Sequence, residues 1–310
     1  MTLLYYDPRF LDHDTGDHPE CAERLRQIMA ELDHCGLTDR CERPSWQPAD
    51  SERLATLHDL KHVESMRHLA AGGGGRVDPD TVVSPPSFDI GKLAAGAVCD
   101  AVDRVLSDEA RKAFCLVRPP GHHALPQRAM GFCLFNNIAL GAQVALERGV
   151  GRVLIVDWDV HHGNGTQDCF YDDPRVGFFS VHRWPFYPGT GDADETGTND
   201  GLGATRNLPL PFGTSRGEYL KAVTAELEDF ATRIKPELVL VSAGFDSHRA
   251  DPVGSLGLEV EDFQMLSGLV TSLADAHAQG RVVSVLEGGY NPPVLAKCVA
   301  THLEHLLGRT

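Results

Sequence analysis

Residues 153–163 read VLIVDWDVHHG, an apolar run that ends in acidic residues and histidines. In an extended chain, side chains two residues apart point the same way, so Asp157, Asp159 and His161 are expected on one face of a strand. Carboxylate oxygens and an imidazole nitrogen are ligands that suit zinc or a similar divalent ion. The alternative is that two buried acids and a histidine satisfy one another beside a turn. A metal site therefore needs further ligands from elsewhere in the chain.

The composition is that of an ordinary globular protein, with 310 residues, 42% of them hydrophobic and 23% charged. No apolar run approaches the length of about 18 residues that would suggest a membrane span. The N-terminal MTLLYYDPRF also lacks the pattern of a signal peptide. We therefore expect a cytoplasmic protein with no membrane partner. The eight cysteines are scattered and are expected to be reduced thiols.

The formal net charge is −16. Because proteins that grip nucleic acid need a basic face, nucleic acid is not an expected partner. An acidic protein attracts cationic molecules over long distances, which favours partners such as lysine-rich peptides or polyamines.

Short β-branched apolar runs alternate with amphipathic helical stretches, the pattern of a parallel sheet covered on both faces. The predicted strands are Leu3–Tyr6, Ala113–Val117, Val153–Asp157, Gly177–Val181, Leu238–Ser242 and Val282–Leu286. The predicted helices are Ala22–Cys35, His62–Ala71, Gly91–Leu106, Ile138–Glu147, Glu218–Ile234, Asp262–Ala278 and Pro293–Leu307. No repeat or long linker divides them, so residues 1–310 are predicted to form one domain.

Polar, glycine-rich segments follow five of these strands and carry His, Asp and Tyr. In open α/β sheets, ligands bind at the carboxyl edge of the strands, so these segments are expected to meet in one crevice. A third metal ligand is expected from the segment DSHRADP, which offers Asp246 and Asp251. The residues alone do not choose between them.

Three further segments supply candidates for catalysis and binding. The pair His122-His123 lies in a turn flanked by Pro and Gly, and imidazole is the usual group for moving protons near neutral pH. Tyr290 follows two glycines, so its hydroxyl could donate to a developing oxyanion. Phe132 and Tyr187 are loop aromatics that could either pack in the core or wall a slot for an aliphatic chain.

Six ordered segments together resemble the zinc-dependent histone deacetylase family, which includes bacterial amidohydrolases and acetylpolyamine amidohydrolases. They are RPPGHHA (118–124), GFCLFNNIAL (131–140), VDWDVHHGNGTQ (156–167), SVHR with YPGTGD (180–192), SAGFDSHRADPVGSL (242–256) and LEGGYN (286–291). The resemblance begins near HPECAERL (18–25) and covers almost the whole chain. It implies the arginase/deacetylase fold, a single α/β domain with an eight-stranded, mostly parallel sheet.

The resemblance also assigns roles to individual residues. It implies zinc ligands Asp159, His161 and Asp251, with Asp251 preferred to Asp246. It makes His123 the general base and then the acid, with His122 as electrostatic support, Asp157 and Asn164 as the residues that orient the two histidines, and Tyr290 as the oxyanion donor. Phe132 and Tyr187 would line an acyl-lysine tunnel with Gly131 at its floor.

Relatives in this family also bind structural potassium ions. The matching positions for an inner site are Asp157, Asp159, His161, Ser180 and Val181. Those for an outer site are Phe170, Asp173 and Val176.

Some positions depart from the nuclear enzymes of the family. Asn164 replaces an aspartate and Glu287 replaces a glycine, as in class II and bacterial members. Leu258 takes a rim position where a polyamine-selective relative carries an acid, which favours acyl-lysine over acetylpolyamine. Asp80 matches a position that holds the substrate backbone in some members.

The expected activity is zinc-dependent removal of an acetyl or other acyl group from the ε-amine of lysine in a peptide or protein. One alternative is a deacetylase of acetylated polyamines or another small amide, and another is an acyl-lysine reader without activity. A two-manganese arginase-like site is disfavoured, because Gly163 stands where that site needs a carboxylate.

Overall fold

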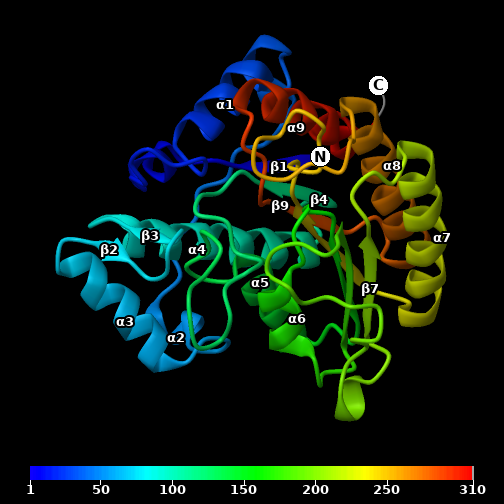
Figure 1. The fold of residues 1–310 in the computed structure, drawn as a ribbon, viewed down its shortest axis with the longest axis horizontal. Coiled ribbons are helices and arrows are strands. Elements are labelled where there is room, and N and C mark those ends of the chain that lie inside the picture. Colours follow the sequence, from blue (N-terminus) through cyan, green and yellow to red (C-terminus); the bar gives the residue numbers. More distant parts are fainter. Residues whose placement is uncertain (309–310) are drawn as a thin grey trace.

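A parallel sheet of seven strands, in the order β1-β4-β9-β8-β5-β6-β7, forms the centre of the computed structural model, which describes residues 1–308 (Figure 1). The strands are β1 (Thr2–Tyr5), β4 (Lys112–Cys115), β9 (Val282–Leu286), β8 (Leu238–Ala243), β5 (Val153–Asp157), β6 (Val176–Arg183) and β7 (Thr205–Leu210). Every neighbouring pair runs parallel. All carboxyl ends therefore lie along one edge, where the predicted site residues are found.

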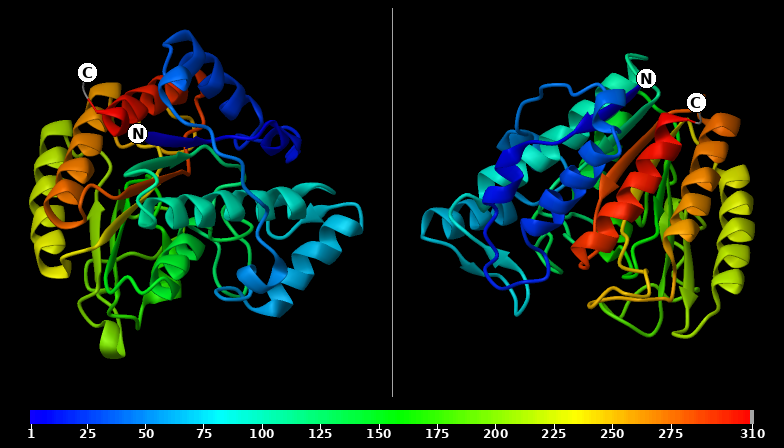
Figure 2. Two further views of the ribbon diagram at one scale, coloured as in Figure 1. Left: turned by 180° about the vertical axis from the view of Figure 1, so that it is seen from behind. Right: turned by 90° about the horizontal axis from the view of Figure 1, so that it is seen from above.

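Helices cover both faces of the sheet (Figures 1 and 2). On one face lie α4 (Ser87–Leu106), α5 (Asn137–Glu147) and the short α6 (Asn164–Phe170). On the other lie α7 (Arg216–Ile234), α8 (Val260–His277) and α9 (Pro292–Leu307), with α1 (Glu23–His34) packed against α9. The helices α2 (Ser51–Leu54) and α3 (Leu60–Ala71) and the hairpin β2 (Gly75–Arg76) with β3 (Val82–Val83) project beyond α4.

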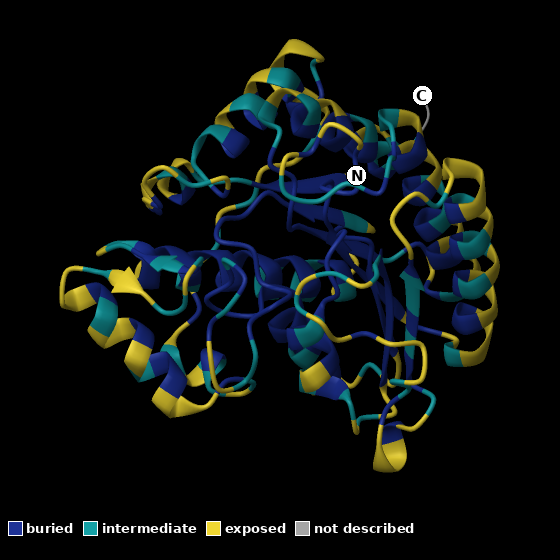
Figure 3. Ribbon diagram, in the orientation of Figure 1, coloured by how far each residue is buried: buried dark blue, intermediate teal, exposed yellow. Residues whose placement is uncertain are grey.

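Burial explains why these segments fold as they do (Figure 3). Every residue of β5, β8 and β9 is buried, as expected for strands covered on both faces. The outer helices α7 and α8 are striped, with buried residues on the side toward the sheet and exposed residues on the outer side (Figure 3). Within residues 1–308, no helix combines the length and the apolar character needed to cross a bilayer.

The predicted sheet of eight strands is wrong by one strand in the part of the chain that the structure describes. The predicted strands Val153–Asp157 and Val282–Leu286 have the observed bounds, and the other four differ by one or two residues at one or both ends. β7 was not predicted. Its sequence TRNLPL mixes polar and apolar residues and contains Pro209, which an edge strand tolerates because only one side is paired.

A buried ionic cluster fixes the N-terminal segment beneath the sheet edge. The carboxylate of Glu20 lies between two fully buried guanidinium groups, accepting from Arg118 Nη2 at 2.9 Å and from Arg24 Nη1 at 3.1 Å. Arg118 also donates to the carbonyls of Phe10 and His13. Arg24 donates to the carbonyls of Glu287 and Gly289, on the loop after β9. The first 25 residues therefore hold that loop in place.

Candidate active site

Three buried side chains from two loops converge at the carboxyl edge of the sheet. Asp159, His161 and Asp246 each offer a ligand atom, and these atoms all lie within 4.8 Å of one another. His161 Nδ1 is 3.0 Å from Asp159 Oδ1 and 3.1 Å from Asp246 Oδ2. Two carboxylates and one imidazole are a typical donor set for a catalytic divalent metal.

The observed geometry differs from the strand face expected from the sequence. β5 ends at Asp157, and the next residues form a loop. The Asp157 carboxylate accepts from the Asp159 amide at 3.1 Å, and the Asp159 carboxylate accepts from the His161 amide at 3.0 Å. Aspartate side chains that bond the backbone two residues on favour turns over strands, which explains where β5 ends.

The donor set fits a cation. Asp246 Oδ2 is buried and makes no well-aligned hydrogen bond, although His161 Nδ1 lies 3.1 Å away, while its other oxygen accepts from the Val160 amide at 2.9 Å. Burial and the nearby Asp159 carboxylate raise the pKa of Asp246 to about 7. A positive ion placed among these oxygens would relieve that repulsion.

Gly288 closes the space behind the cluster. Its amide donates to Asp159 Oδ2 at 2.8 Å, and a Cβ atom built on it would lie 2.5 Å from that oxygen and closer still to Asp246 Oδ2. Only glycine lets the backbone approach both carboxylates this closely.

The structure corrects the predicted third ligand from Asp251 to Asp246. Both oxygens of Asp251 bond backbone amides: Oδ1 accepts from Val253 and Gly254 at 2.9 Å each, and Oδ2 accepts from Tyr290 at 2.6 Å. Asp251 therefore organises its own loop and the backbone of Tyr290, and it lies outside the cluster.

The two adjacent histidines of the turn after β4 have different partners. His122 Nδ1 is 2.9 Å from Asp157 Oδ2, and His123 Nδ1 is 2.7 Å from Asn164 Oδ1. Because an amide oxygen only accepts, His123 Nδ1 carries a proton and Nε2 remains as its acceptor. The two rings are 4.0 Å apart between centroids.

These surroundings separate the two imidazoles electrostatically. Burial opposes protonation of His122, but the Asp157 and Asp159 carboxylates outweigh it and raise its pKa to about 10. Burial, followed by the charge of His122, lowers the pKa of His123 well below its ordinary value. His122 is thus the charged partner, and His123 is the neutral ring that can accept a proton.

Glu287 holds the histidine turn against the sheet. One of its oxygens accepts from the amides of Gly121 at 2.7 Å and His122 at 3.2 Å, and the other accepts from the Ser242 hydroxyl at 3.1 Å. The sequence showed Glu287 as a departure within a motif, but it gave no sign of this contact.

A cavity of about 240 Å³ leads to these groups. Its lining consists of Asp80, His123, Gly131, Phe132, His161, Phe186, Tyr187, Val253 and Tyr290. The Phe132 ring meets the Tyr290 ring edge-on at 5.6 Å, and the Tyr187 ring meets the His123 ring edge-on at 5.2 Å. Gly131, with φ +55°, lies against the His123 ring, where a Cβ would collide. The structure thus brings six predicted binding and catalytic residues, together with the predicted metal ligand His161, to one narrow, aromatic-walled pocket.

A model of the histone deacetylase domain matches residues 18–306. The chain belongs to this family. A histone deacetylase-like amidohydrolase from Pseudomonas aeruginosa is 39% identical over 293 residues, which are 94% of this chain and 77% of that protein. The human polyamine deacetylase HDAC10 is 41% identical over 99% of this chain and 48% of its own length. The crystal structure of the HDA15 HD domain superposes with a TM-score of 0.94 at 36% identity, covering 99% of this chain and 88% of that one.

Membership of the histone deacetylase family and the likeness to its solved structure confirm the α/β class and make the protein a deacetylase-type amidohydrolase with a candidate Asp-His-Asp metal site. The substrates of this protein therefore belong to the class of acetylated compounds on which the family acts. Which of them the chain uses is a separate question, because the similar proteins include one named for polyamines.

The predicted rim position of Leu258 is wrong. Leu258 is fully buried in the main core, and its backbone bonds that of Ser247 and Arg249. The apolar residue that lines the pocket is Val253, two residues after Asp251. Counting forward from the motif does not reveal that the chain after Gly254 turns back into the core.

The positions matched to potassium sites lie at two places near β6. Ser180 pairs with Asp157 in the register of β5 and β6, beside Val181. Phe170 ends α6, and Val176 begins β6. The Asp173 carboxylate between them is engaged by Arg175, with Nε at 2.9 Å. These sites stay predictions.

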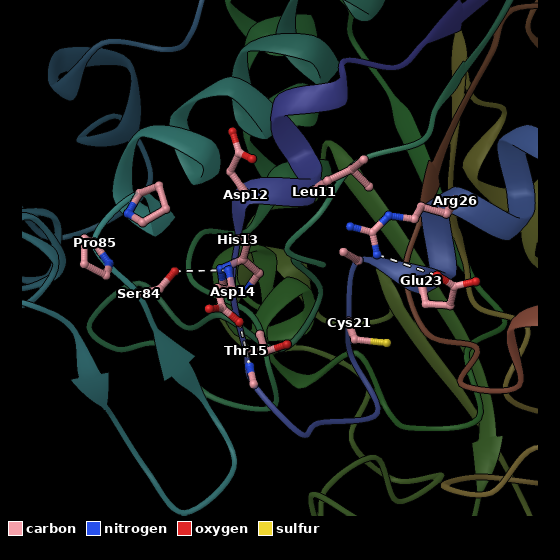
Figure 4. A pocket seen from close by; sticks show the side chains of 13 residues that line it. Leu11, Asp12, His13, Asp14, Thr15, Cys21, Glu23, Arg26, Ser84 and Pro85 are labelled. Atoms are coloured by element: carbon pink, nitrogen blue, oxygen red, sulfur yellow. Dashed lines mark hydrogen bonds and ion pairs between the residues drawn. The ribbon is translucent and has the colours of Figure 1, made fainter.

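A larger groove of about 630 Å³ lies beside the N-terminal segment (Figure 4). It is lined by residues 11–16, 21–23, 26 and 84–86. His13 at its floor is 2.7 Å from the Ser87 hydroxyl, and Glu23 pairs with Arg26 at 3.6 Å. None of the predicted site residues lines this groove, so cavity size alone would point to the wrong place.

Proposed function

We propose that the protein is a zinc-dependent amidohydrolase that removes acetyl groups from the ε-amine of lysine in peptides or proteins. The observation that carries the proposal is the narrow pocket, whose aromatic walls end at the Asp159, His161 and Asp246 cluster with His123 and Tyr290 beside it. A linear acyl-lysine side chain fits such a slot. The whole of residues 1–310 is proposed to act as one catalytic domain.

Asp159, His161 and Asp246 would hold the zinc ion. The chemistry that zinc supplies when bound is Lewis-acid polarisation of the amide carbonyl and of the attacking water. His123 Nε2 takes the proton from that water as its oxygen adds to the carbonyl carbon, and it returns the proton to the amine nitrogen as the C–N bond breaks. The products are a carboxylate and the free lysine amine.

Other residues support this proton transfer. The charged His122, bonded to Asp157, places positive charge beside the reacting centre. Asn164 fixes the tautomer and orientation of His123. Tyr290 is proposed to donate its hydroxyl to the developing oxyanion.

The potassium positions belong to the same proposal. A monovalent ion beside Asp157, Asp159, His161, Ser180 and Val181 would stabilise the loop that follows β5. The outer position at Phe170, Asp173 and Val176 would stabilise the connection between α6 and β6. Activity and thermal stability measured in potassium and in a bulky monovalent cation would test both.

The pocket rim favours acyl-lysine over acetylpolyamine. Asp80 is the single carboxylate in the lining outside the metal cluster, and Val253 presents an apolar surface. A polyamine carries further ammonium groups, which need carboxylate partners to leave water. A peptide backbone needs only hydrogen bonds, which Asp80 can accept.

A panel of substrates tests the proposal. The zinc-loaded enzyme is assayed on an acetyl-lysine peptide, acetylputrescine and acetylspermidine, each with and without a chelator. The proposal expects chelator-sensitive turnover with kcat/KM highest for the peptide. A preference for the polyamines would instead support the small-amide alternative. Peptide binding without any turnover would support a non-enzymatic reader.

Replacing Tyr290 with Phe tests the oxyanion role. We expect Tyr290→Phe to lower kcat by about 10²- to 10³-fold, the effect of losing one oxyanion donor. Zinc content should be unchanged, because Asp159, His161 and Asp246, which would hold the ion, are all kept in this variant. Turnover at the wild-type rate would remove Tyr290 from the mechanism.

A further inference from the structure

One wall of the pocket is a phenylalanine that the sequence did not single out. Phe186 lines the cavity, and its ring stacks on the His161 imidazole with centroids 5.1 Å apart and planes 14° apart. Its position therefore fixes the width of the pocket next to the metal cluster, where the acyl group would lie.

The same ring contacts a cation that comes from the end of β6. The guanidinium carbon of Arg183 lies 4.1 Å from the centroid of the Phe186 ring and 4.3 Å from that of the Phe212 ring. The Nε of Arg183 is buried without a hydrogen-bond partner among the described residues. The two aromatic rings are thus the main partners of this charge.

Phe212 is exposed to an unusual extent for its size, at 66%. It lies in the loop that follows the edge strand β7, and so at the same edge of the sheet as the pocket. Neither Phe212 nor Arg183 lines the cavity. Arg183 Nη1 also donates to the carbonyl of Gly254 at 3.3 Å, next to the pocket residue Val253. Arg183 therefore links three loops around the pocket.

We propose that Arg183 and Phe212 form a brace that positions Phe186 against His161 and so sets the acyl-chain selectivity of the enzyme. The inference rests on the proposed deacetylase function. Arg183 and Phe212 are positioning residues, because they act on the substrate only through the Phe186 ring. Without the brace, the pocket loosens on one side, so it holds an acetyl group less tightly and admits longer acyl groups more easily.

The test uses the full-length enzyme and the variant Phe212→Leu, which keeps an apolar side chain but loses the ring face. We expect KM for an acetyl-lysine peptide to rise about three- to tenfold, the range for one partly exposed cation–π contact, with kcat little changed. The ratio of kcat/KM for acetyl-lysine to that for butyryl-lysine should fall by a similar factor. Arg183→Met should act in the same direction.

Two variants serve as controls. Phe212→Tyr keeps the ring face and should retain the wild-type selectivity. Leu202→Ala removes another highly exposed apolar side chain, 70% exposed, in the loop before β7, and should leave the kinetics unchanged. A Phe212→Leu enzyme with wild-type KM and acyl ratio would overturn the brace, as would a loss of kcat without a change in the acyl ratio.

A second measurement separates the brace from the proposed function. In protein labelled with 4-fluorophenylalanine, the fluorine resonance of Phe186 is assigned by its loss in Phe186→Leu. Without any substrate, this resonance should shift in Phe212→Leu and stay in place in Leu202→Ala. Absence of turnover by the wild-type enzyme would refute the proposed function, whereas an unmoved resonance in Phe212→Leu would refute the brace.

Discussion

Asp246 and Asp251 lie five residues apart in one loop, yet their carboxylates have different partners. Asp246 keeps one oxygen without a hydrogen-bond partner beside His161, whereas three backbone amides use both oxygens of Asp251. Removing the charge from each residue should therefore have different effects.

The matched variants Asp246→Asn and Asp251→Asn test this difference. We expect Asp246→Asn to lose most of its bound zinc, because a neutral amide is a poor ligand. Asp251→Asn should keep its zinc but lose activity. The NH2 group of the new side chain would face the backbone N–H of Tyr290, and two donors cannot hydrogen-bond to each other. Metal analysis after dialysis, with kcat for both variants, checks the prediction. Equal zinc loss in both variants would contradict the assignment of Asp246.

Gly288→Ala tests how tightly the backbone packs on the metal cluster. The added methyl would push against the carboxylates of Asp159 and Asp246, so we expect zinc affinity to fall at least tenfold. Gly217→Ala is the matched control, because a Cβ at Gly217 meets nothing within 4 Å. Zinc titration of both apoproteins would measure the effect, and equal affinities would show that the loop can move aside.

The sequence predicted the types of residue in the site better than their contacts. His122, His123, Tyr290, Phe132 and Tyr187 could be proposed because polar and aromatic residues after strands stand out against the apolar runs. The choice between Asp246 and Asp251 could not be made from the residues, because both lie in one loop and only its path decides which carboxylate faces His161. Leu258 was misplaced for the same reason.

Among the helices and strands, those that are fully buried were predicted most accurately from the sequence. β5 and β9 were predicted to the residue, because strands covered on both faces are continuously apolar. β7 was missed because an edge strand bonds on one side and tolerates polar residues and Pro209. α6 was missed because NGTQDCF is short and lacks a helical apolar pattern. The short α2, β2 and β3 were also not predicted, but α6 and β7 are the missed elements that border the site, where Asn164 begins α6 and Phe212 follows β7.

The end of α7 offers a test of local backbone conformation. Lys235 caps this helix with a left-handed backbone, φ +50° and ψ +63°, a conformation that favours glycine. We expect Lys235→Gly to raise the free energy of unfolding by about 1 kcal/mol, whereas Lys235→Ala should give no gain. The bond from Arg152 Nε reaches the backbone carbonyl of Lys235 and is kept in both variants. Urea unfolding would compare them, and equal stability of the Gly and Ala variants would contradict the reasoning.

At the scale of the whole molecule, buried neutral histidines link stability to pH. His302 lies between the hydroxyls of Ser267 and Ser284, each at 2.7 Å, and burial lowers its pKa to about 3. Above pH 6.5 the ring is neutral in both the folded and the unfolded states. Below that pH the histidine binds a proton in the unfolded chain but not in the folded protein. The free energy of unfolding therefore falls as the pH drops toward about 3.

The variant His302→Gln isolates this contribution. Between pH 7 and pH 5, wild type should lose about 2 kcal/mol more unfolding free energy than the variant. The variant is compared with wild type because a second buried group, Glu287, also titrates in this pH range. Burial raises the pKa of Glu287 to about 7, so its contribution to the free energy of unfolding grows as the pH falls, and this contribution is the same in both proteins. Urea unfolding at pH 7, 6 and 5 gives the two slopes. Parallel slopes would show that His302 does not titrate as expected.

The ionic cluster of Glu20, Arg24 and Arg118 determines where a protein shortened at its N-terminus can begin. The family match begins at residue 18, but Arg118 is held by carbonyls of Phe10 and His13, and β1 starts at Thr2. An expression plasmid trimmed to the family boundary would remove an edge strand and leave a buried guanidinium without two of its acceptors. The boundary of homology and the boundary of the smallest foldable fragment are therefore different in this protein.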